Sequence, residues 1–234
     1  MALKKKTRPY LRYKKFLKLK QNVQNKSKII NFKSKKWQSM VLKEKRNFRF
    51  SYKIKHIDQF NYFVPKFTDF FSNKFKLDLY AKQKFVYLYG YLTKKSLKSY
   101  INKGMTKDKI NYWLLKQLES RLDSVLYRSH FVDSFRTARQ LISHGHILVN
   151  NTVVKKHSFN LTEGDVISVS KKTHILIEKK ILKSNFLPLT PKYLQVNYKI
   201  FFISFLGNLT TNNLTNQFTF WLNSKTVVDF YKHN

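Results

Sequence analysis

Histidines and closely spaced carboxylates are the side chains of this 234-residue chain that could do chemistry. Glu163 and Asp165 flank a glycine, a spacing that could pair two carboxylates for proton transfer but is more typical of a turn between strands. His144, His146 and His157 lie close together, yet the chain has no cysteine and no obvious carboxylate to complete a metal site with them. The sequence also contains no Gly-rich phosphate loop and no Ser/His/Asp set. We therefore predict a protein that is not an enzyme, with no metal site and no cofactor.

Cationic and hydrogen-bonding side chains recur along one predicted helix, over residues 135–143. Its apolar residues Ala138, Leu141 and Ile142 share one side, because positions three and four apart lie on one helix face. The opposite side is basic and rich in hydrogen-bond donors. Ser134 occupies the N-cap position, which gives the helix its own start signal. The residues on the basic side are Arg136, Arg139, Gln140 and Ser143.

A preceding helix and a following hairpin are predicted to position this basic side. The preceding helix has one apolar stripe at helical spacing, with two arginines off the stripe. The stripe comprises Leu118, Leu122, Val125 and Leu126, and the arginines are Arg121 and Arg128. Gly145 permits a helix exit with positive φ before a strand at 147–149, and Asn150-Asn151 suits a hairpin turn because Asn tolerates the left-handed region. The residues His144, Lys155 and Lys156 would extend the basic side.

This order of residues resembles the small RNA-binding module of the small-subunit ribosomal protein uS4 family. The matching residues are Arg121-Leu122-Asp123, Tyr127-Arg128, Ala138-Arg139-Gln140-Leu141, Ser143-His144-Gly145-His146-Ile147, Val149-Asn150 and Gly164-Asp165. The resemblance implies two helices packed on a short antiparallel sheet over residues 118–172. It also implies a set of RNA-binding residues: Arg121, Arg128, Ser134, Arg136, Arg139, Gln140, Ser143, His144, Lys155 and Lys156.

The chain departs from the family pattern at three places. The Ser-Arg pair that opens the second helix in the family is Ser134-Phe135 here, with Arg136 displaced by one position. A shift of one residue rotates a side chain by about 100° around a helix, so this change affects one specific phosphate contact. The hairpin Asn-Gly is Asn150-Asn151, and a proline common in the next loop is His157. The displacement of Arg136 is not expected to alter the fold.

The flanks extend the resemblance to roughly residues 82–231. Lys82-Gln83-Lys84 and Tyr89-Gly90 resemble the helical region before the module, and Pro191–Val196 and Val227–Tyr231 resemble the end of the family's chains. The implied fold is α+β, a helical domain with the RNA-binding module inserted into it. We expect a basic N-terminal arm at 1–57, the helical domain at 58–117, the module at 118–172, and a C-terminal segment at 173–234 that returns to the helical domain.

Composition identifies the class of partner. Lys and Arg number 47 against 12 Asp and Glu, which gives a formal net charge of +35. Such an excess repels itself unless a polyanion neutralises it, and 14 Tyr and 21 Phe add stacking surface. No apolar run approaches the 18 or so residues of a membrane-spanning helix, and the longest, 200–206, is interrupted by Ser204. We therefore predict nucleic acid as the partner and no membrane association.

Composition and the N-terminal residues also bear on location. Lys, Asn, Phe and Tyr are abundant while Gly numbers five and Pro four, a bias typical of an A/T-rich organellar gene. The divergence from bacterial-type sequences favours the mitochondrion, with the plastid as second choice. The first acidic residue is Glu44, but the preceding segment is rich in Lys and Tyr and not in Arg and Ser as a transit peptide is. We read it as a basic arm that threads RNA.

The resemblance implies that the protein would be a constituent of the mitochondrial small ribosomal subunit that supports subunit assembly and translation. It would bind small-subunit rRNA and neighbouring ribosomal proteins and lie near the path of mRNA. The alternative is a stand-alone RNA-binding factor, for ribosome rescue or RNA modification, built on the same module. Ser120–Asp123 superficially resembles the catalytic motif of pseudouridine synthases, but it lies inside the module, and the residues after 170 are too few for a catalytic domain. We expect Asp123 to pair with a basic neighbour.

Overall fold

The computed structural model describes residues 16–19, 23, 34–49, 74–104, 110–183, 190–207, 209 and 224–232. These fall into two units, Met1–Thr68 with Thr219–Trp221, and Asp69–Phe218 with Leu222–Asn234. In the first unit, helix α3 spans Lys35–Arg49 and buries Trp37 and Met40. The expected arm therefore contains a helix, and most of its remaining residues lie outside those that the structure describes.

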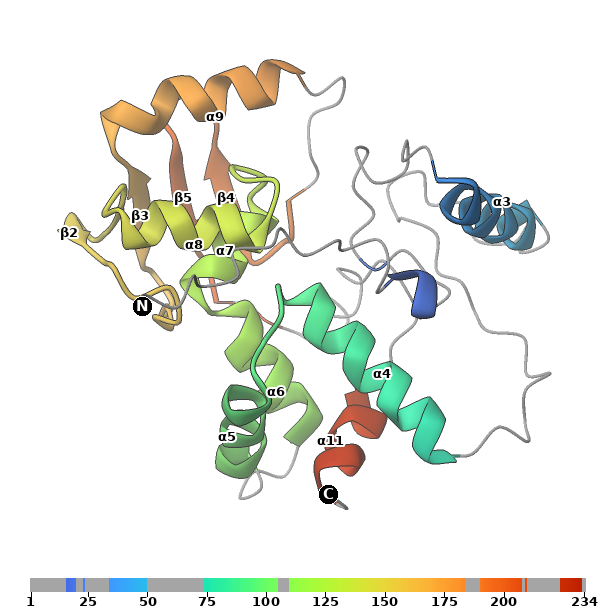
Figure 1. The fold of residues 1–234 in the computed structure, drawn as a ribbon. Helices are drawn as coiled ribbons and strands as arrows, with labels where there is room; N and C mark the ends of the chain where they lie inside the picture. The colour runs from blue at the N-terminus through green and yellow to red at the C-terminus, as the bar shows by residue number, and fades with distance from the viewer. Residues whose placement is uncertain are drawn as a thin grey trace, which may run out of the picture. The chain divides into compact units, whose positions relative to one another are not determined.

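Four helices of the second unit make up the helical region (Figure 1). They are α4 at Lys74–Leu88, α5 at Lys94–Gly104, α6 at Ile110–Glu119 and α11 at Ser224–Lys232. Helix α11 packs mainly against α4 and also contacts α5 and α6. Lys82 of α4 lies 4.7 Å from the ring centroid of Phe230. Helix α11, near the end of the chain, therefore belongs to the helical region.

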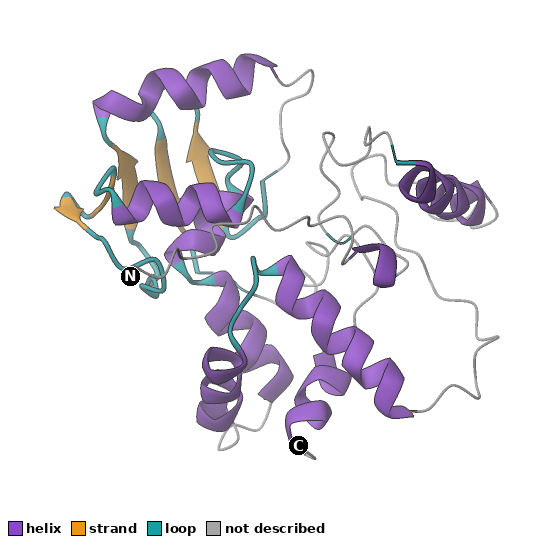
Figure 2. Cartoon of the chain, viewed as in Figure 1, coloured by secondary structure: helices purple, strands orange, loops and turns teal. Residues whose placement is uncertain are grey.

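The rest of the second unit is the module, an antiparallel sheet with helices (Figure 2). The helices are α7 at Leu122–Arg128, α8 at Phe135–Ser143 and α9 at Lys171–Lys183. The strands are β1 at Ile147–Val149, β2 at Thr152–Val153, β3 at Val166–Val169, β4 at Leu194–Asn197 and β5 at Phe202–Phe205. The strand order is β2-β1-β3-β5-β4, and α7 and α8 lie in front of the sheet in Figure 1. The α+β class is confirmed.

Two features differ from the expected module. The apolar stripe from Leu118, predicted to lie on one helix, is shared between the end of α6 and α7. The helix is interrupted at Arg121, which has an extended backbone and forms an isolated β-bridge with Asn160. Strands β4 and β5 also join the module sheet through β3, so only the end of the segment 173–234 returns to the helical region. The sequence-based boundary at residue 172 therefore cuts through a continuous sheet.

The local signals for helix and turn are confirmed. Ser134 caps α8, with its hydroxyl oxygen accepting from the backbone N–H of Thr137 at 3.1 Å. Asn150 and Asn151 have φ of 47° and 65° between β1 and β2, the left-handed pair of a tight hairpin. Gly145 has φ of 73° at the exit of α8. Helix α8 thus has its start and its end fixed by residues next to it in sequence.

Among the described residues, no helix combines the length and the apolar character needed to cross a bilayer.

Candidate RNA-binding face and the buried ion pairs behind it

The outer side of α8 is exposed and cationic. Phe135, Ala138 and Ile142 are buried on its inner side, so the side chains between them are turned outward. A Cβ placed on Gly145 would lie 3.7 Å from Cε of Lys155, so this lysine, which follows β2, adjoins the end of α8. We call this surface the α8 face. Its exposed residues are Arg136, Gln140, Ser143, His144, Lys155 and Lys156.

Two of the predicted hydroxyl contacts serve the helix itself. Ser134 is half-buried and its oxygen is engaged in the N-cap. The Ser143 hydroxyl donates to the carbonyl oxygen of Gln140 at 2.9 Å. Arg136 is exposed, with its guanidinium 5.7 Å from the ring centroid of Tyr91. Although this arginine is displaced by one position from the family pattern, it is still at the surface of α8.

Arg139 connects α8 to the helical region. Its Nε donates to Oδ2 of Asp123 at 2.8 Å. Its Nη1 and Nη2 donate to the backbone carbonyls of Gly90 at 2.7 Å and Tyr89 at 3.0 Å, just beyond the end of α4. With 23% of its side chain exposed, Arg139 has most of its polar surface turned toward protein. It differs in this from the exposed phosphate ligand that the sequence pattern predicts.

Arg121 and Asp123 form a buried ion pair, which corrects the outward placement predicted for Arg121. The guanidinium donates through Nε and Nη2 to the two carboxylate oxygens at 2.9 and 2.8 Å. Its Nη1 donates to the Tyr100 hydroxyl at 3.2 Å. Burial lowers the pKa of Arg121, but the hydrogen bonds and charge of Asp123 outweigh it and the pKa is raised. Asp123 is fully buried and pairs with basic neighbours, as expected.

Arg128 is also buried, which is a second correction to the predicted surface. Its Nη2 and Nε donate to Oε1 and Oε2 of Glu119 at 2.7 and 3.0 Å. The same two oxygens accept from the hydroxyls of Tyr89 at 2.7 Å and Tyr193 at 2.8 Å. We call these four residues the Glu119 quartet. It joins the residue after α4, helices α6 and α7, and the residue before β4.

The quartet is electrostatically matched. Burial alone would raise the pKa of Glu119, but the charge and hydrogen bonds of Arg128 and the two tyrosine hydroxyls outweigh it, and the pKa is lowered. Burial, followed by the nearby carboxylate, raises the pKa of Tyr89 and Tyr193 well above the ordinary tyrosine value. The carboxylate is therefore charged and both phenols are neutral donors at neutral pH.

The histidines do not converge on one point. The rings of His144 and His146 are 6.2 Å apart, and Nδ1 of His146 lies 3.3 Å from the hydroxyl of Ser170. Burial lowers the pKa of His157, with a partly opposing effect from Asp123. Within the described part of the chain, no three His, Cys, Asp or Glu side chains are grouped as metal ligands would be.

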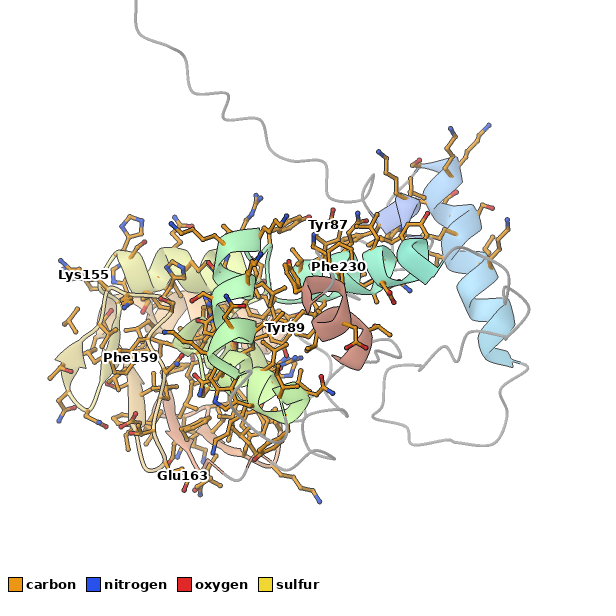
Figure 3. All side chains as sticks on the ribbon, turned by 90° about the horizontal axis from the view of Figure 1, so that it is seen from below. Tyr87, Tyr89, Lys155, Phe159, Glu163 and Phe230 are labelled. Atoms are coloured by element: carbon orange, nitrogen blue, oxygen red, sulfur yellow. The ribbon has the colours of Figure 1, made fainter. Side chains whose placement is uncertain are left out.

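The carboxylates at 163 and 165 belong to a turn, as predicted. Gly164 has φ of 89°, and Oδ2 of Asp165 accepts from the backbone N–H of Thr162 at 2.7 Å. Figure 3 shows Glu163 and Lys155 at well-separated places on the module. This acidic turn therefore lies apart from the lysines of the α8 face.

Residues 120–167 match the S4 domain family, and this match gives the class of protein to which the module belongs. The match covers both short helices, the α8 face and strands β1 and β2, and reaches into β3.

Similarity to whole proteins extends further. The chain is 32% identical to small ribosomal subunit protein uS4m of Reclinomonas americana over 191 residues, which are 76% of each chain. It is 33% identical over 126 residues to uS4 of Kosmotoga olearia, covering 53% of this chain and 61% of the relative. It is 31% identical over 160 residues to uS4 of Acholeplasma laidlawii, covering 68% and 77%. The chain belongs to the small ribosomal subunit protein uS4 family.

Proposed function

We propose that this protein is a structural constituent of the small ribosomal subunit and binds small-subunit rRNA through the α8 face. The observation that carries the proposal is the separation of charge around α8. Asp123 and Glu119 are buried and form ion pairs with arginines, while Arg136, Lys155 and Lys156 are exposed. Because these two carboxylates are paired with other arginines, they do not compete for the exposed cations, which are suited to phosphate oxygens.

The proposal divides the ten predicted RNA-binding residues by role. The exposed members of the α8 face contact RNA, with the lysines and Arg136 neutralising phosphate and Gln140 and His144 offering hydrogen bonds. Arg121, Arg128 and Arg139 hold the module against the helical region, and Ser134 starts the helix. Because α8 is held at several points, the backbone that carries its cations has a fixed position, which favours recognition of a folded RNA by shape.

The finer assignments follow from composition and family. The composition typical of an A/T-rich gene and the similarity to a relative named uS4m support the mitochondrion. Membership in a ribosomal protein family supports neighbouring small-subunit proteins as partners, and we extend this to a position near the mRNA path. We assign the chain no catalytic role, since its relatives are named as ribosomal proteins. The basic arm at 1–57, the helical domain at 58–117 and the module from 118 remain our domain assignment.

Two experiments test the proposal. First, the protein should co-sediment stoichiometrically with small subunits after a high-salt wash, whereas a stand-alone factor would be washed off. Second, Arg136→Ala and Lys155→Ala should each weaken binding to small-subunit rRNA and reduce the slope of log affinity against log salt by about 0.7–0.9 for each phosphate that is no longer neutralised. Lys179→Ala is the matched control, because Lys179 is exposed on α9. An equal effect of all three substitutions would show non-specific attraction and contradict an RNA site at α8.

A further inference from the structure

A row of side chains crosses the sheet on the side away from α7 and α8. The backbone register pairs Val153 with Leu148, Leu148 with Ser168, Ser168 with Phe202, and Phe202 with Asn197. Residues directly opposite each other on neighbouring strands point to the same face, so these five side chains form one continuous line. The line crosses every strand of the sheet, four steps of about 4.8 Å or roughly 19 Å in all.

This row is on the open side of the sheet. The neighbouring row, with Val149, Ile167 and Ile203 paired in register, is buried against the helices. In the open row Phe202 is 38% exposed and Val153 is 54% exposed. Leu148 and Ser168 are half-buried, and Asn197 is exposed. The row therefore presents an aromatic ring, aliphatic side chains, a hydroxyl and an amide, and contains no charge.

One end of the row meets the α8 face. Cγ1 of Val153 lies 3.3 Å from the position of a Cβ built on Gly145, the residue at which the chain leaves α8. Cε of Lys155 lies 3.7 Å from the same position. An RNA strand bound by the lysines of the α8 face could thus continue over β2 and onto the row without leaving the protein surface.

We propose that this row is a second RNA-contact surface, on which unpaired bases of the bound rRNA stack on Phe202; this inference rests on the proposed function. A phenylalanine ring offers a sequence-tolerant stacking platform, and unpaired bases are the part of RNA that proteins read by stacking. The Ser168 hydroxyl can donate to or accept from a base edge. Oδ1 of Asn197 accepts from the backbone N–H of Lys199 at 3.0 Å, which makes its amide nitrogen the group to donate to a base.

The composition of the row favours RNA over a protein partner. A stable protein interface buries about 800 Å² on each side around a core of large apolar side chains. Here a single aromatic ring stands between a serine and an asparagine. The row also continues a surface proposed to bind RNA, in a chain of net charge +35. The α8 face would hold the backbone, and the row would hold the bases.

Substitutions of Phe202 test the proposal with the full chain and protein-free small-subunit rRNA. Phe202→Ala should weaken binding about five-fold or more, the effect of losing one stacked base, with no change in the salt slope because no charge is removed. Phe202→Tyr should keep the affinity. Phe202→Leu should behave like alanine, since leucine keeps the apolar surface and loses the ring. Ile175→Ala, at an exposed residue of α9, is the control and should bind as wild type does.

Each outcome decides the question. Unchanged affinity in Phe202→Ala, or full affinity in Phe202→Leu, would overturn base stacking on this row. A defect that appears only with assembled small-subunit proteins, and not with bare rRNA, would identify a protein-docking surface and also overturn the proposal. If the wild-type chain itself failed to bind the rRNA, the proposed function would fall instead. Thermal unfolding of each variant, with Phe202→Tyr as the near-isosteric form, separates loss of binding from loss of folding.

Discussion

Replacing Glu119 by glutamine should strongly destabilise the protein, although the two side chains have almost the same shape. Each carboxylate oxygen of Glu119 accepts two hydrogen bonds, one from Arg128 and one from a tyrosine hydroxyl. An amide presents one oxygen and one NH₂ group, so in the variant the NH₂ group would face an N–H of Arg128 and a tyrosine hydroxyl that both donate to Glu119 in the wild type. A tyrosine hydroxyl can turn and accept, but a guanidinium N–H cannot.

The magnitude follows from burial. Glu119 is fully buried, and the Arg128 side chain is 8% exposed, so the arginine would keep its charge but lose the neutralising charge of Glu119, with little water around it. Removing one partner of a buried ion pair costs about 3–5 kcal/mol. For a chain of this size each kcal/mol shifts Tm by about 2–4 °C, which gives a loss of roughly 6–20 °C.

Urea and thermal unfolding of the RNA-free protein at neutral pH, followed by circular dichroism, measure this change. Glu178→Gln is the matched control, since it removes the same charge from an exposed position on α9 and should leave stability within about 0.5 kcal/mol of wild type. A free energy of unfolding for Glu119→Gln within about 1 kcal/mol of wild type would refute the reasoning. In that case the quartet would not be charge-matched in the folded protein.

Three further predictions come from the same contacts. Arg139→Ala should lower the free energy of unfolding by about 1–3 kcal/mol, because Asp123 and two backbone carbonyls lose a hydrogen-bond donor. It should also weaken rRNA binding without changing the slope of log affinity against log salt; a reduced slope would instead identify Arg139 as a phosphate ligand. The pKa of Glu119 in the folded protein is lowered below its unfolded value of 4.5, so the stabilisation by its carboxylate is present above about pH 4.5 and is lost as pH falls through the folded pKa. In Glu119→Gln the free energy of unfolding should therefore depend less steeply on pH in the acid range, and an unchanged dependence would contradict the lowered pKa. The pKa values of Tyr89 and Tyr193 in the folded protein are raised above 10.0, so their contribution to stability is present below pH 10 and is lost as pH rises through the folded values. Tyr193→Phe should lose less stability at alkaline pH than wild type, and an equal loss in that variant would argue against a buried, neutral phenol.

Helix α8 could be predicted in detail because its determinants are local. The N-cap at Ser134, the inward spacing of Ala138 and Ile142, and the exit at Gly145 are all contained within a dozen or so residues, and each acts in the structure as its pattern indicates. The same holds for the Asn150-Asn151 turn. Where a residue's conformation is set by its immediate neighbours, the sequence is a sufficient guide.

The break before α7 could not be predicted, because its cause lies far along the chain. Leu118 and Leu122 have helical spacing and both are buried, so their pattern fits one uninterrupted helix. The interruption comes from Arg121, whose extended backbone forms a bridge with Asn160 and whose side chain is held by Asp123. The addition of β4 and β5 to the module sheet likewise depends on pairing with β3 and not on local pattern.

The burial of Arg121 and Arg128 was missed because charged residues are seldom fully buried unless paired. A signal was available in the acids. The chain has only 12 Asp and Glu, and two of them, Glu119 and Asp123, lie two residues before and two residues after Arg121. In so basic a protein a carboxylate close to an arginine is better explained as a buried partner than as part of a solvated surface.

The burial of Glu119 and Asp123 affects the charge of the α8 face. If Glu119 and Asp123 were exposed beside α8, their negative charges would repel phosphate and compete for the arginines and lysines there. Buried, they are neutralised by Arg121, Arg128 and Arg139. Asp123 joins α7 to α8 through Arg139, and Glu119 joins α6 to α7 and to the residue before β4. Arg136, Lys155 and Lys156 are then left exposed on a rigid support. The same ion pairs that stabilise the fold therefore leave the outer side of α8 positive.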